Sequence, residues 1–219
     1  MTLLSRTGLV FALILLFAAG VPHSAPAQII DSSSSTAPST TTPDDTTDKD
    51  VPYVPTAESV GVRMLEVAGV TEEDVVYDLG SGDGRIPITA AKEFGARGVG
   101  VEIDSALVAK ARAKAREAGV ADKVRFVQGD LFNADLSEAT VVALYLWPEV
   151  NIQLRPKLLE ELDPGDRIVS HDFRMGDWEP ERAVDAGAGN TGQEMVFLWT
   201  VPETVPEGLK DISDETGSP

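Results

Sequence analysis

Two patterns of hydrophobic residues alternate along residues 57–201. One is typical of amphipathic helices and the other of buried strands. Apolar residues at helical spacing predict helices at residues 56–67, 85–94, 105–118 and 148–162. Short apolar runs predict strands at residues 75–79, 98–103, 124–127, 140–146, 166–173, 181–186 and 194–201. This alternation is typical of an α/β fold, in which helices connect the strands of one sheet.

The connections between these segments predict how the strands run. Helices between successive strands favour parallel neighbours, and residues 140–146 are almost wholly apolar, as expected of a central parallel strand. Residues 181–186 and 194–201 have no helix between them, so we expect them to pair as an antiparallel hairpin. The predicted fold is therefore a mostly parallel seven-stranded sheet with a C-terminal antiparallel hairpin.

The N-terminal segment has the layout of a secretory signal. Residues 1–27 contain a single Arg6, an apolar run over residues 9–19 and an Ala25-Pro26-Ala27 ending that matches an A-x-A cleavage site. The apolar run is short for a transmembrane helix. We expect cleavage after Ala27 and export to the periplasm or the extracellular space, with an uncleaved membrane anchor as the alternative.

The composition of the following residues sets the domain boundaries. Residues 31–50 consist of Ser, Thr, Pro and Asp with almost nothing apolar, so they cannot bury enough surface to fold. We expect a disordered linker at residues 28–50, one folded domain at residues 51–202 and a flexible tail at residues 203–219.

Charge and residue usage exclude several functions. The net charge is −18, with 36 acidic against 18 basic residues, which argues against nucleic acid as a partner. The chain has no cysteine, so disulfides, thiolate metal sites and cysteine nucleophiles are excluded. One of the two histidines, His23, lies in the segment expected to be removed, which argues against a His-based metal site.

A glycine-rich turn follows the first predicted strand. Residues 75–84 read VVYDLGSGDG, so an apolar strand passes through Asp78 into three alternating glycines. Glycines let a chain turn sharply into a helix while its backbone N–H groups approach a ligand closely. An acidic residue about 20 positions later, here Glu102, suits the hydroxyl groups of a ribose. The pattern predicts a cradle for a nucleotide-type cofactor, and the alternative is a glycine-rich turn without a ligand.

The glycine spacing distinguishes between two cofactors. A dinucleotide-binding turn has the form Gly-x-Gly-x-x-Gly/Ala, but the residue three positions after Gly82 is Arg85. A carboxylate at Asp78 would repel a pyrophosphate and would attract the ammonium group of S-adenosylmethionine. The spacing therefore favours S-adenosylmethionine. We expect Asp130 to accept a hydrogen bond from the adenine amino group, or to cap a helix instead. The expected cofactor-binding residues are Asp78, Gly80, Ser81, Gly82, Asp83, Gly84, Glu102, Ile103, Asp130 and Leu131.

Three segments together carry a family resemblance: VPYVPT at residues 51–56, DLGSGDGR at residues 78–85 and GVGVEI at residues 98–103. Residues 51–201 resemble class I S-adenosylmethionine-dependent methyltransferases, and more closely the ATP-synthase c-subunit lysine methyltransferase family and its bacterial relatives. The resemblance implies a Rossmann-like fold, S-adenosylmethionine as cofactor and a protein substrate with a lysine acceptor, membrane-associated proteins included. It also implies that Tyr53 and Thr56 cover the methionine end of the cofactor, the alternative being a Pro-rich segment that only packs on the sheet.

Residues at the ends of the fourth and fifth predicted strands are candidates for contact with the acceptor, because ligands of open α/β sheets bind at the carboxyl ends of strands. Trp147 would line the acceptor channel or would only pack, and His171 with Asp172 would accept a proton or form a structural pair. Two other functions compete: methylation of a small molecule, and cofactor binding without catalysis by an exported domain, since the methyl donor is made in the cytoplasm.

Overall fold

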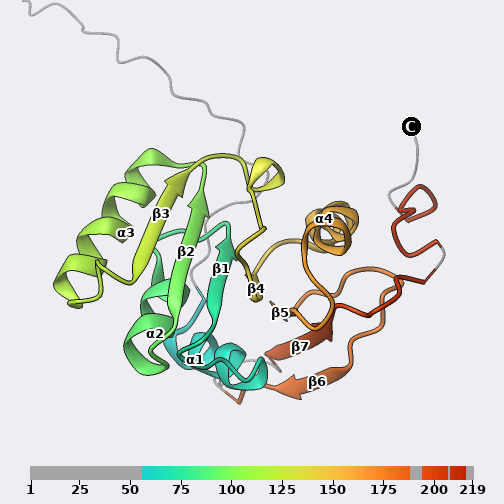
Figure 1. The fold of residues 1–219 in the computed structure, drawn as a ribbon, viewed down its shortest axis with the longest axis horizontal. Coiled ribbons are helices and arrows are strands. Elements are labelled where there is room, and N and C mark those ends of the chain that lie inside the picture. Colours follow the sequence, from blue (N-terminus) through green and yellow to red (C-terminus); the bar gives the residue numbers. More distant parts are fainter. Residues whose placement is uncertain (1–55, 188–193, 207, 216–219) are drawn as a thin grey trace, which may run out of the picture. The chain divides into compact units, whose positions relative to one another are not determined.

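The computed structural model describes residues 56–187, 194–206 and 208–215, and a seven-stranded sheet lies at their centre (Figure 1). The strands are β1 (Val75–Leu79), β2 (Arg97–Glu102), β3 (Val124–Gln128), β4 (Val141–Leu144), β5 (Arg167–His171), β6 (Arg182–Asp185) and β7 (Met195–Thr200). Their order is β3-β2-β1-β4-β5-β7-β6, and β7 runs antiparallel to both β5 and β6 while the other pairs are parallel. The predicted fold class, including the C-terminal hairpin, is confirmed.

The helices follow the predicted order. They are α1 (Glu58–Val67), α2 (Arg85–Glu93), α3 (Ser105–Glu117) and α4 (Pro148–Glu161), and a short 3₁₀ helix, η1 (Leu131–Asn133), follows β3. Helix η1 was not predicted, because three residues are too few to show a periodicity. Among the described residues, no helix combines the length and the apolar character that crossing a membrane would need.

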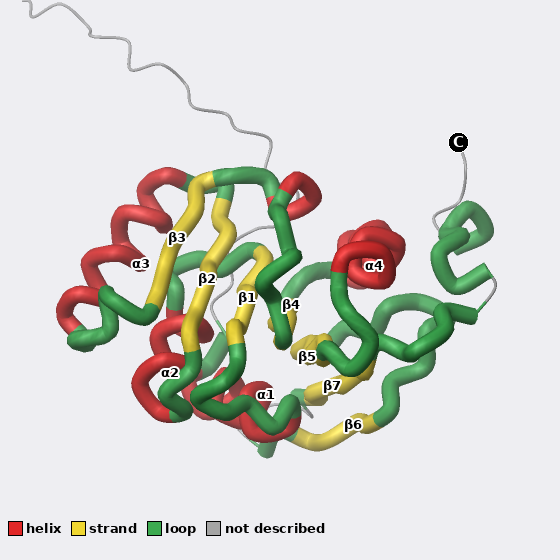
Figure 2. The backbone as a smooth tube through the Cα atoms, viewed as in Figure 1, coloured by secondary structure: helices red, strands yellow, loops and turns green. Residues whose placement is uncertain are grey.

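Alternate residues of each central strand enter two separate hydrophobic cores. On one face, Tyr77 and Leu144 pack with α4 residues such as Leu154. On the other face, Val76 and Val141 pack with residues of α1 and α2. Figure 2 shows the corresponding layers, with α1, α2 and α3 on one side of the strands and α4 on the other. Both faces of the sheet are thus covered, which explains why its central strands are apolar at nearly every position.

The strand register brings the carboxyl ends of the central strands together. Leu79 at the end of β1 pairs with Leu144 at the end of β4, and Leu144 pairs with Ser170 near the end of β5. On its other side, Leu79 pairs with Val101 of β2. The segments that follow β1, β2, β4 and β5 therefore emerge at one edge of the sheet, where the sequence places its candidate residues.

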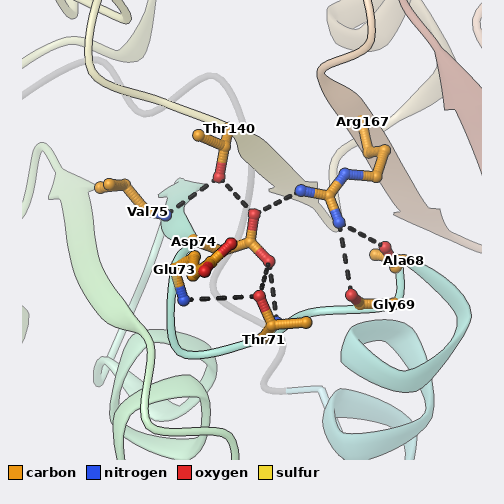
Figure 3. Close-up of polar contacts among 8 residues, drawn as sticks. All are labelled: Ala68, Gly69, Thr71, Glu73, Asp74, Val75, Thr140 and Arg167. Carbon is orange, nitrogen blue, oxygen red and sulfur yellow. Dashed lines mark hydrogen bonds and ion pairs between the residues drawn. The ribbon is translucent and has the colours of Figure 1, made fainter.

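A polar network ties together the opposite, amino-terminal ends of β1, β4 and β5 (Figure 3). Asp74 accepts hydrogen bonds from the Thr71 backbone N–H at 2.8 Å and from the Thr140 hydroxyl at 2.7 Å, and it pairs with Arg167. Arg167 also donates to the Ala68 carbonyl at 3.0 Å, which ties the end of α1 to β5. Burial alone would raise the pKa of Asp74, but the hydrogen bonds from Thr140, Thr71 and Arg167 hold that pKa below its usual value.

Residues of the C-terminal segment contact α4. The Arg155 side chain, only 1% exposed, donates to the Met175 carbonyl at 2.8 Å and pairs with Glu215. Glu215 also accepts from the Asp177 backbone N–H at 2.8 Å. Within the segment for which the sequence predicted a flexible tail, Glu215 is thus the partner of a buried guanidinium.

The Asp74 network predicts a stability effect that depends on pH. Asp74→Asn should lower the free energy of unfolding at pH 7 by about 1–3 kcal/mol, because the variant leaves buried donors without an acceptor. A carboxyl whose pKa is lowered by folding stabilises the fold above its unfolded pKa, and this contribution is lost as the pH falls through the folded pKa. The difference from the parent chain should therefore shrink below about pH 3.8.

Urea unfolding at pH 7 and at pH 3 measures both effects. The control is Glu73→Gln, which neutralises the adjacent exposed carboxylate and should change the midpoint little. Equal stability of Asp74→Asn and the parent chain at pH 7 would contradict the assigned role of the network.

Candidate functional site

The turn between β1 and α2 depends on its glycines. Gly80, Gly82 and Gly84 have φ values of 81°, 52° and 79°, in the left-handed region that other residues rarely adopt. A Cβ atom on Gly84 would lie 2.6 Å from ring atoms of Phe126, so the turn also packs too closely for a side chain there. The N–H groups of Gly80 and Ser81 both donate to the Val101 carbonyl at 2.9 Å, which fixes the turn to β2.

Glu102 braces this turn from the end of β2. Its carboxylate accepts hydrogen bonds from the Gly82 backbone N–H at 2.8 Å and from the Asp104 backbone N–H at 2.9 Å. A carboxylate has about four acceptor positions, so these two bonds leave room for two hydroxyl donors. The geometry therefore fits the expected contact with a ribose.

Asp78 lies buried near the end of β1, just before the turn. Its carboxyl group accepts no hydrogen bond from the described residues. Burial raises the pKa of Asp78 to about 8, with further contributions from the nearby carboxylates of Glu102 and Asp83 that the charge of Arg85 only partly offsets. A buried acid next to two carboxylates favours a cationic ligand group, so the site fits the ammonium of S-adenosylmethionine and would repel a pyrophosphate.

Asp83 differs from Asp78, because cations surround it. Its carboxylate pairs with Arg85 at 3.0 Å and with Lys114, and Lys110 lies 3.8 Å away. Burial alone would raise the pKa of Asp83, but Arg85 and Lys114 hold it well below its usual range. The sequence placed Asp83 among the cofactor contacts, whereas the structure uses its carboxylate to join α2 to α3. The i, i+4 spacing of Lys110 and Lys114 was the available signal for this cluster.

Thr56, two residues before α1, approaches the same turn. Thr56 is buried, and its backbone carbonyl accepts a hydrogen bond from the Arg85 guanidinium. The chain leading into the domain therefore approaches the glycine turn. Tyr53, the other residue expected to cover the cofactor, lies outside the described residues.

Asp130 follows β3 and caps the 3₁₀ helix η1. Its carboxylate accepts from the Phe132 backbone N–H at 2.9 Å and from the Asn133 side chain at 3.2 Å. Gly129 donates its N–H to the Glu102 carbonyl at 3.0 Å, which holds Asp130 close to the end of β2. The capping role is present, and free acceptor positions remain on the carboxylate for an adenine amino group. The neighbours Ile103 and Leu131 are both partly buried.

Aromatic rings gather where β4 and β5 end. Trp147, 46% exposed, lies with its ring 5.4 Å from that of Phe173, and the Tyr145 ring lies 6.2 Å from Phe173. A Cβ atom on Gly80 would lie 3.1 Å from a methyl carbon of Leu146. The segment that follows β4, which also carries Tyr145 and Trp147, therefore contacts the glycine turn at Gly80.

The His171–Asp172 pair has an unusual geometry. His171 Nε2 lies 3.4 Å from Asp172 Oδ2, but neither ring nitrogen makes a hydrogen bond within the described residues. Burial lowers the pKa of His171 despite the nearby carboxylates of Asp172 and Glu194, so the ring is neutral near pH 7. Asp172 has a φ of 61°, and the Phe173 N–H donates to the His171 carbonyl across it at 2.8 Å. A strained conformation of this kind is common at functional sites.

Asn151 supports this strained turn and was not expected from the sequence. The fully buried amide of Asn151 donates to the Ser170 hydroxyl at 3.2 Å and to the Phe173 carbonyl at 3.3 Å. A polar residue among the apolar positions of α4 was the only available signal. Within the described part of the chain, no group of three or more His, Cys, Asp or Glu side chains is arranged to hold a metal ion.

Comparison with known proteins identifies relatives of this chain. Residues 78–182 match the family model described as ANTKMT methyltransferase domain. A protein-lysine N-methyltransferase of Saccharolobus islandicus is 47% identical over 154 residues, which cover 70% of this chain and 95% of that protein. The lysine N-methyltransferase of Mus musculus that is named for the ATP-synthase c-subunit is 33% identical, with 77% of this chain and 72% of that protein covered.

Two solved structures similar to this chain contain S-adenosyl-L-homocysteine or S-adenosylmethionine. A crystal structure described as an RNA methyltransferase from Salinibacter ruber, in complex with S-adenosyl-L-homocysteine, is 62% identical with a TM-score of 0.68. The match covers 71% of this chain and 99% of that one. A geranyl diphosphate methyltransferase in complex with S-adenosylmethionine, 14% identical with a TM-score of 0.55 over 66% of this chain and 85% of that one, shares the fold alone.

The raised pKa of Asp78 predicts that cofactor binding depends on pH. Below pH 8 most Asp78 carboxyl groups in the free protein are protonated, whereas an ammonium favours the ionised form. The affinity for S-adenosylhomocysteine should therefore rise between pH 6 and pH 7.5, by up to about tenfold per unit, and binding should release a proton. Isothermal titration calorimetry in two buffers of different ionisation enthalpy measures both quantities.

Two variants complete this test. Asp78→Asn should remove the pH dependence and weaken binding about tenfold or more at pH 7.5, because a charged hydrogen bond is lost. Asp74→Asn, an identical change at the opposite end of β1, should keep the pH dependence of the parent chain. A parent chain that binds with equal affinity at pH 6 and pH 7.5 would show that Asp78 does not meet the ammonium.

Proposed function

The chain belongs to the S-adenosylmethionine-dependent methyltransferases, in the family that includes protein-lysine N-methyltransferases, and from this premise we propose that it methylates lysine side chains of a protein. The observation that carries the lysine acceptor is the 47% identity to a protein-lysine N-methyltransferase, which extends over 95% of that relative. The aromatic and acidic surroundings of the strand ends support it, because rings and carboxylates favour a cationic side chain.

The residues of the cradle have separate roles in this proposal. Asp78 would hold the ammonium of the cofactor, and Glu102 would hold the ribose while it braces the turn through Gly82. When bound, S-adenosylmethionine supplies a methyl group that its sulfonium already activates. The protein therefore needs no group to activate the donor, and its main tasks are to align the two reactants and to exclude water.

The acceptor side has to provide an uncharged amine. A lysine nitrogen carries a proton near pH 7 and has no free lone pair until that proton leaves. Asp172 and the neutral ring of His171 lie at the end of β5, beside the cradle. The Trp147 ring is exposed next to them and would guide the aliphatic part of the lysine side chain toward the methyl group.

RNA is the principal competing acceptor, because the relative from Salinibacter ruber is described as an RNA methyltransferase. Two features favour a protein instead. The net charge of −18 disfavours contact with phosphates. In addition, Lys110 and Lys114, which lie near the glycine turn, are both held against the Asp83 carboxylate.

An assay with a labelled methyl donor tests the proposal. Incubation of the protein and labelled S-adenosylmethionine with a cell extract should place label in the protein fraction, on lysine residues identified by mass spectrometry. Asp78→Asn should reduce the rate at subsaturating cofactor about 10–100-fold, because it removes a charged hydrogen bond to the donor. Glu73→Gln serves as the matched control.

Label in the other fractions of the extract would support the alternative functions. Label confined to RNA or to small molecules would overturn the lysine assignment. An absence of label in every fraction, together with tight binding of cofactor, would favour a domain that binds without catalysis.

We also propose that the chain is exported, on the basis of the signal-like composition of residues 1–27. Fractionation of cells that carry a C-terminally tagged chain should recover a shortened form, beginning near Gln28, outside the cytoplasm. Recovery of the full-length chain in the cytosol would refute export, and recovery in the membrane fraction would favour an uncleaved anchor.

A further inference from the structure

Glu194 carries a buried carboxylate oxygen that lacks a hydrogen-bond partner in the described part of the chain. This residue lies directly before β7, where its backbone carbonyl accepts a hydrogen bond from the Ala186 N–H at 2.7 Å. Its Oε2 atom is buried and makes no hydrogen bond within the described residues. An unsatisfied buried acceptor destabilises a folded protein, so its presence needs an explanation beyond folding.

The surroundings of Glu194 contain further unsatisfied polar groups. The His171 side chain is 3% exposed, and neither of its ring nitrogens has a hydrogen-bond partner among the described residues. Its Nε2 faces Asp172 Oδ2 at 3.4 Å. The backbone N–H of Met195, the residue next to Glu194, donates to the other Asp172 oxygen at 2.9 Å. Asp172 is thus fixed between His171 and the start of β7.

Tyr145 completes the cluster from the end of β4. Its ring centroid lies 4.2 Å from that of His171. Burial raises the pKa of Tyr145, and the carboxylates of Asp172 and Glu194 raise it further, because both lie close enough to disfavour a third negative charge. Two carboxylates and two rings at the ends of β4 and β5 and at the start of β7 therefore lie near one another at one position of the fold.

A row of rings leads from the surface to this position. The row begins at Trp147, which is 46% exposed, and continues to Phe173 with ring centroids 5.4 Å apart. Tyr145 follows at 6.2 Å from Phe173, and the buried His171 ends the row. Trp147 is exposed, Phe173 and Tyr145 are partly buried, and His171 is buried.

We propose that Glu194 and Asp172, together with the rings of Tyr145 and His171, form the binding site for the ammonium group of the acceptor lysine. This proposal rests on the proposed function for the identity of the acceptor, but the site itself would bind any primary alkylammonium. The row of rings receives the methylene groups of the side chain. The ammonium then satisfies the buried Glu194 oxygen, and the ring faces favour its positive charge.

The same site accounts for the proton that the lysine must lose. The ammonium proton passes to the Glu194 carboxylate, which becomes a neutral carboxylic acid, and the nitrogen recovers its lone pair. This lone pair forms the new bond to the methyl carbon while the bond between that carbon and sulfur breaks, and the bonding electrons remain on sulfur. Glu194 then returns its proton to water, and the methylated amine leaves as a cation.

Binding of a lysine side-chain mimic tests the site without relying on turnover. The probe is n-butylammonium, and the matched neutral probe is 1-butanol, both added to the full chain saturated with S-adenosylhomocysteine. The chain contains only two histidines, so the ring resonances of His171 are readily assigned by NMR. We expect n-butylammonium to shift these resonances in a saturable manner, and 1-butanol to bind at least tenfold more weakly.

A pair of variants assigns the effect to one carboxylate. Glu194→Gln keeps the shape of the side chain and removes an unsatisfied buried charge, so the fold should be retained. It should weaken n-butylammonium binding about tenfold or more, raise KM for the lysine substrate and lower kcat, with the affinity for S-adenosylhomocysteine unchanged. Glu203→Gln removes an exposed carboxylate just beyond β7 and should match the parent chain in each measurement.

Failure of the site and failure of the proposed function give different results. Equal binding of n-butylammonium and 1-butanol, or unchanged binding by Glu194→Gln, would overturn the site even if the protein methylates lysine. If n-butylammonium binding depends on Glu194 but no lysine is methylated, the ammonium site stands and the lysine acceptor is wrong.

Discussion

The burial of three carboxyl groups around one glycine turn is the constraint on which the cofactor cradle depends. Glu102 is satisfied by backbone N–H groups, and Asp83 is satisfied by Arg85 and Lys114. Asp78 has no comparable partner among the residues that the structure describes, and burial raises its pKa. The first two carboxylates hold the turn and the adjoining helices in place. The third stores an unfavourable interaction that a cationic ligand group can relieve.

The amino-terminal end of the sheet contributes to stability, and the carboxyl end carries the candidate functional residues. At the amino-terminal end, Asp74, Thr140 and Arg167 satisfy one another and join α1 to three strands. At the carboxyl end, buried polar atoms of Ser81, His171 and Glu194 lack partners among the described residues. Unsatisfied groups are costly in a folded protein, so the presence of these three at the carboxyl end indicates where ligands complete the structure. This distribution agrees with the general placement of ligand sites in open α/β sheets.

Local patterns in the sequence account for the fold and for the cradle. The limits of β1 were predicted from its apolar run, and the glycine spacing after it predicted a turn that only glycines can form. The remaining features depend on contacts between distant residues. Arg155 meets Glu215 across 60 positions, and Lys114 meets Asp83 across 31. The strained φ of Asp172 and the neutral state of Asp78 likewise follow from tertiary packing, which no local pattern encodes.

Titration of the Asp78 carboxyl group would show whether this group is protonated in the free protein and becomes ionised when the ammonium of the cofactor binds. The carboxyl carbon of Asp78, assigned by its absence in Asp78→Asn, can be followed by ¹³C NMR across a pH series, first in the free protein and then with S-adenosylhomocysteine bound. We expect a pKa near 8 in the free protein and a lower value in the complex, because the ammonium stabilises the ionised form. A pKa near 4 in the free protein, typical of an ordinary aspartate, or a pKa that binding leaves unchanged, would contradict the role assigned to Asp78.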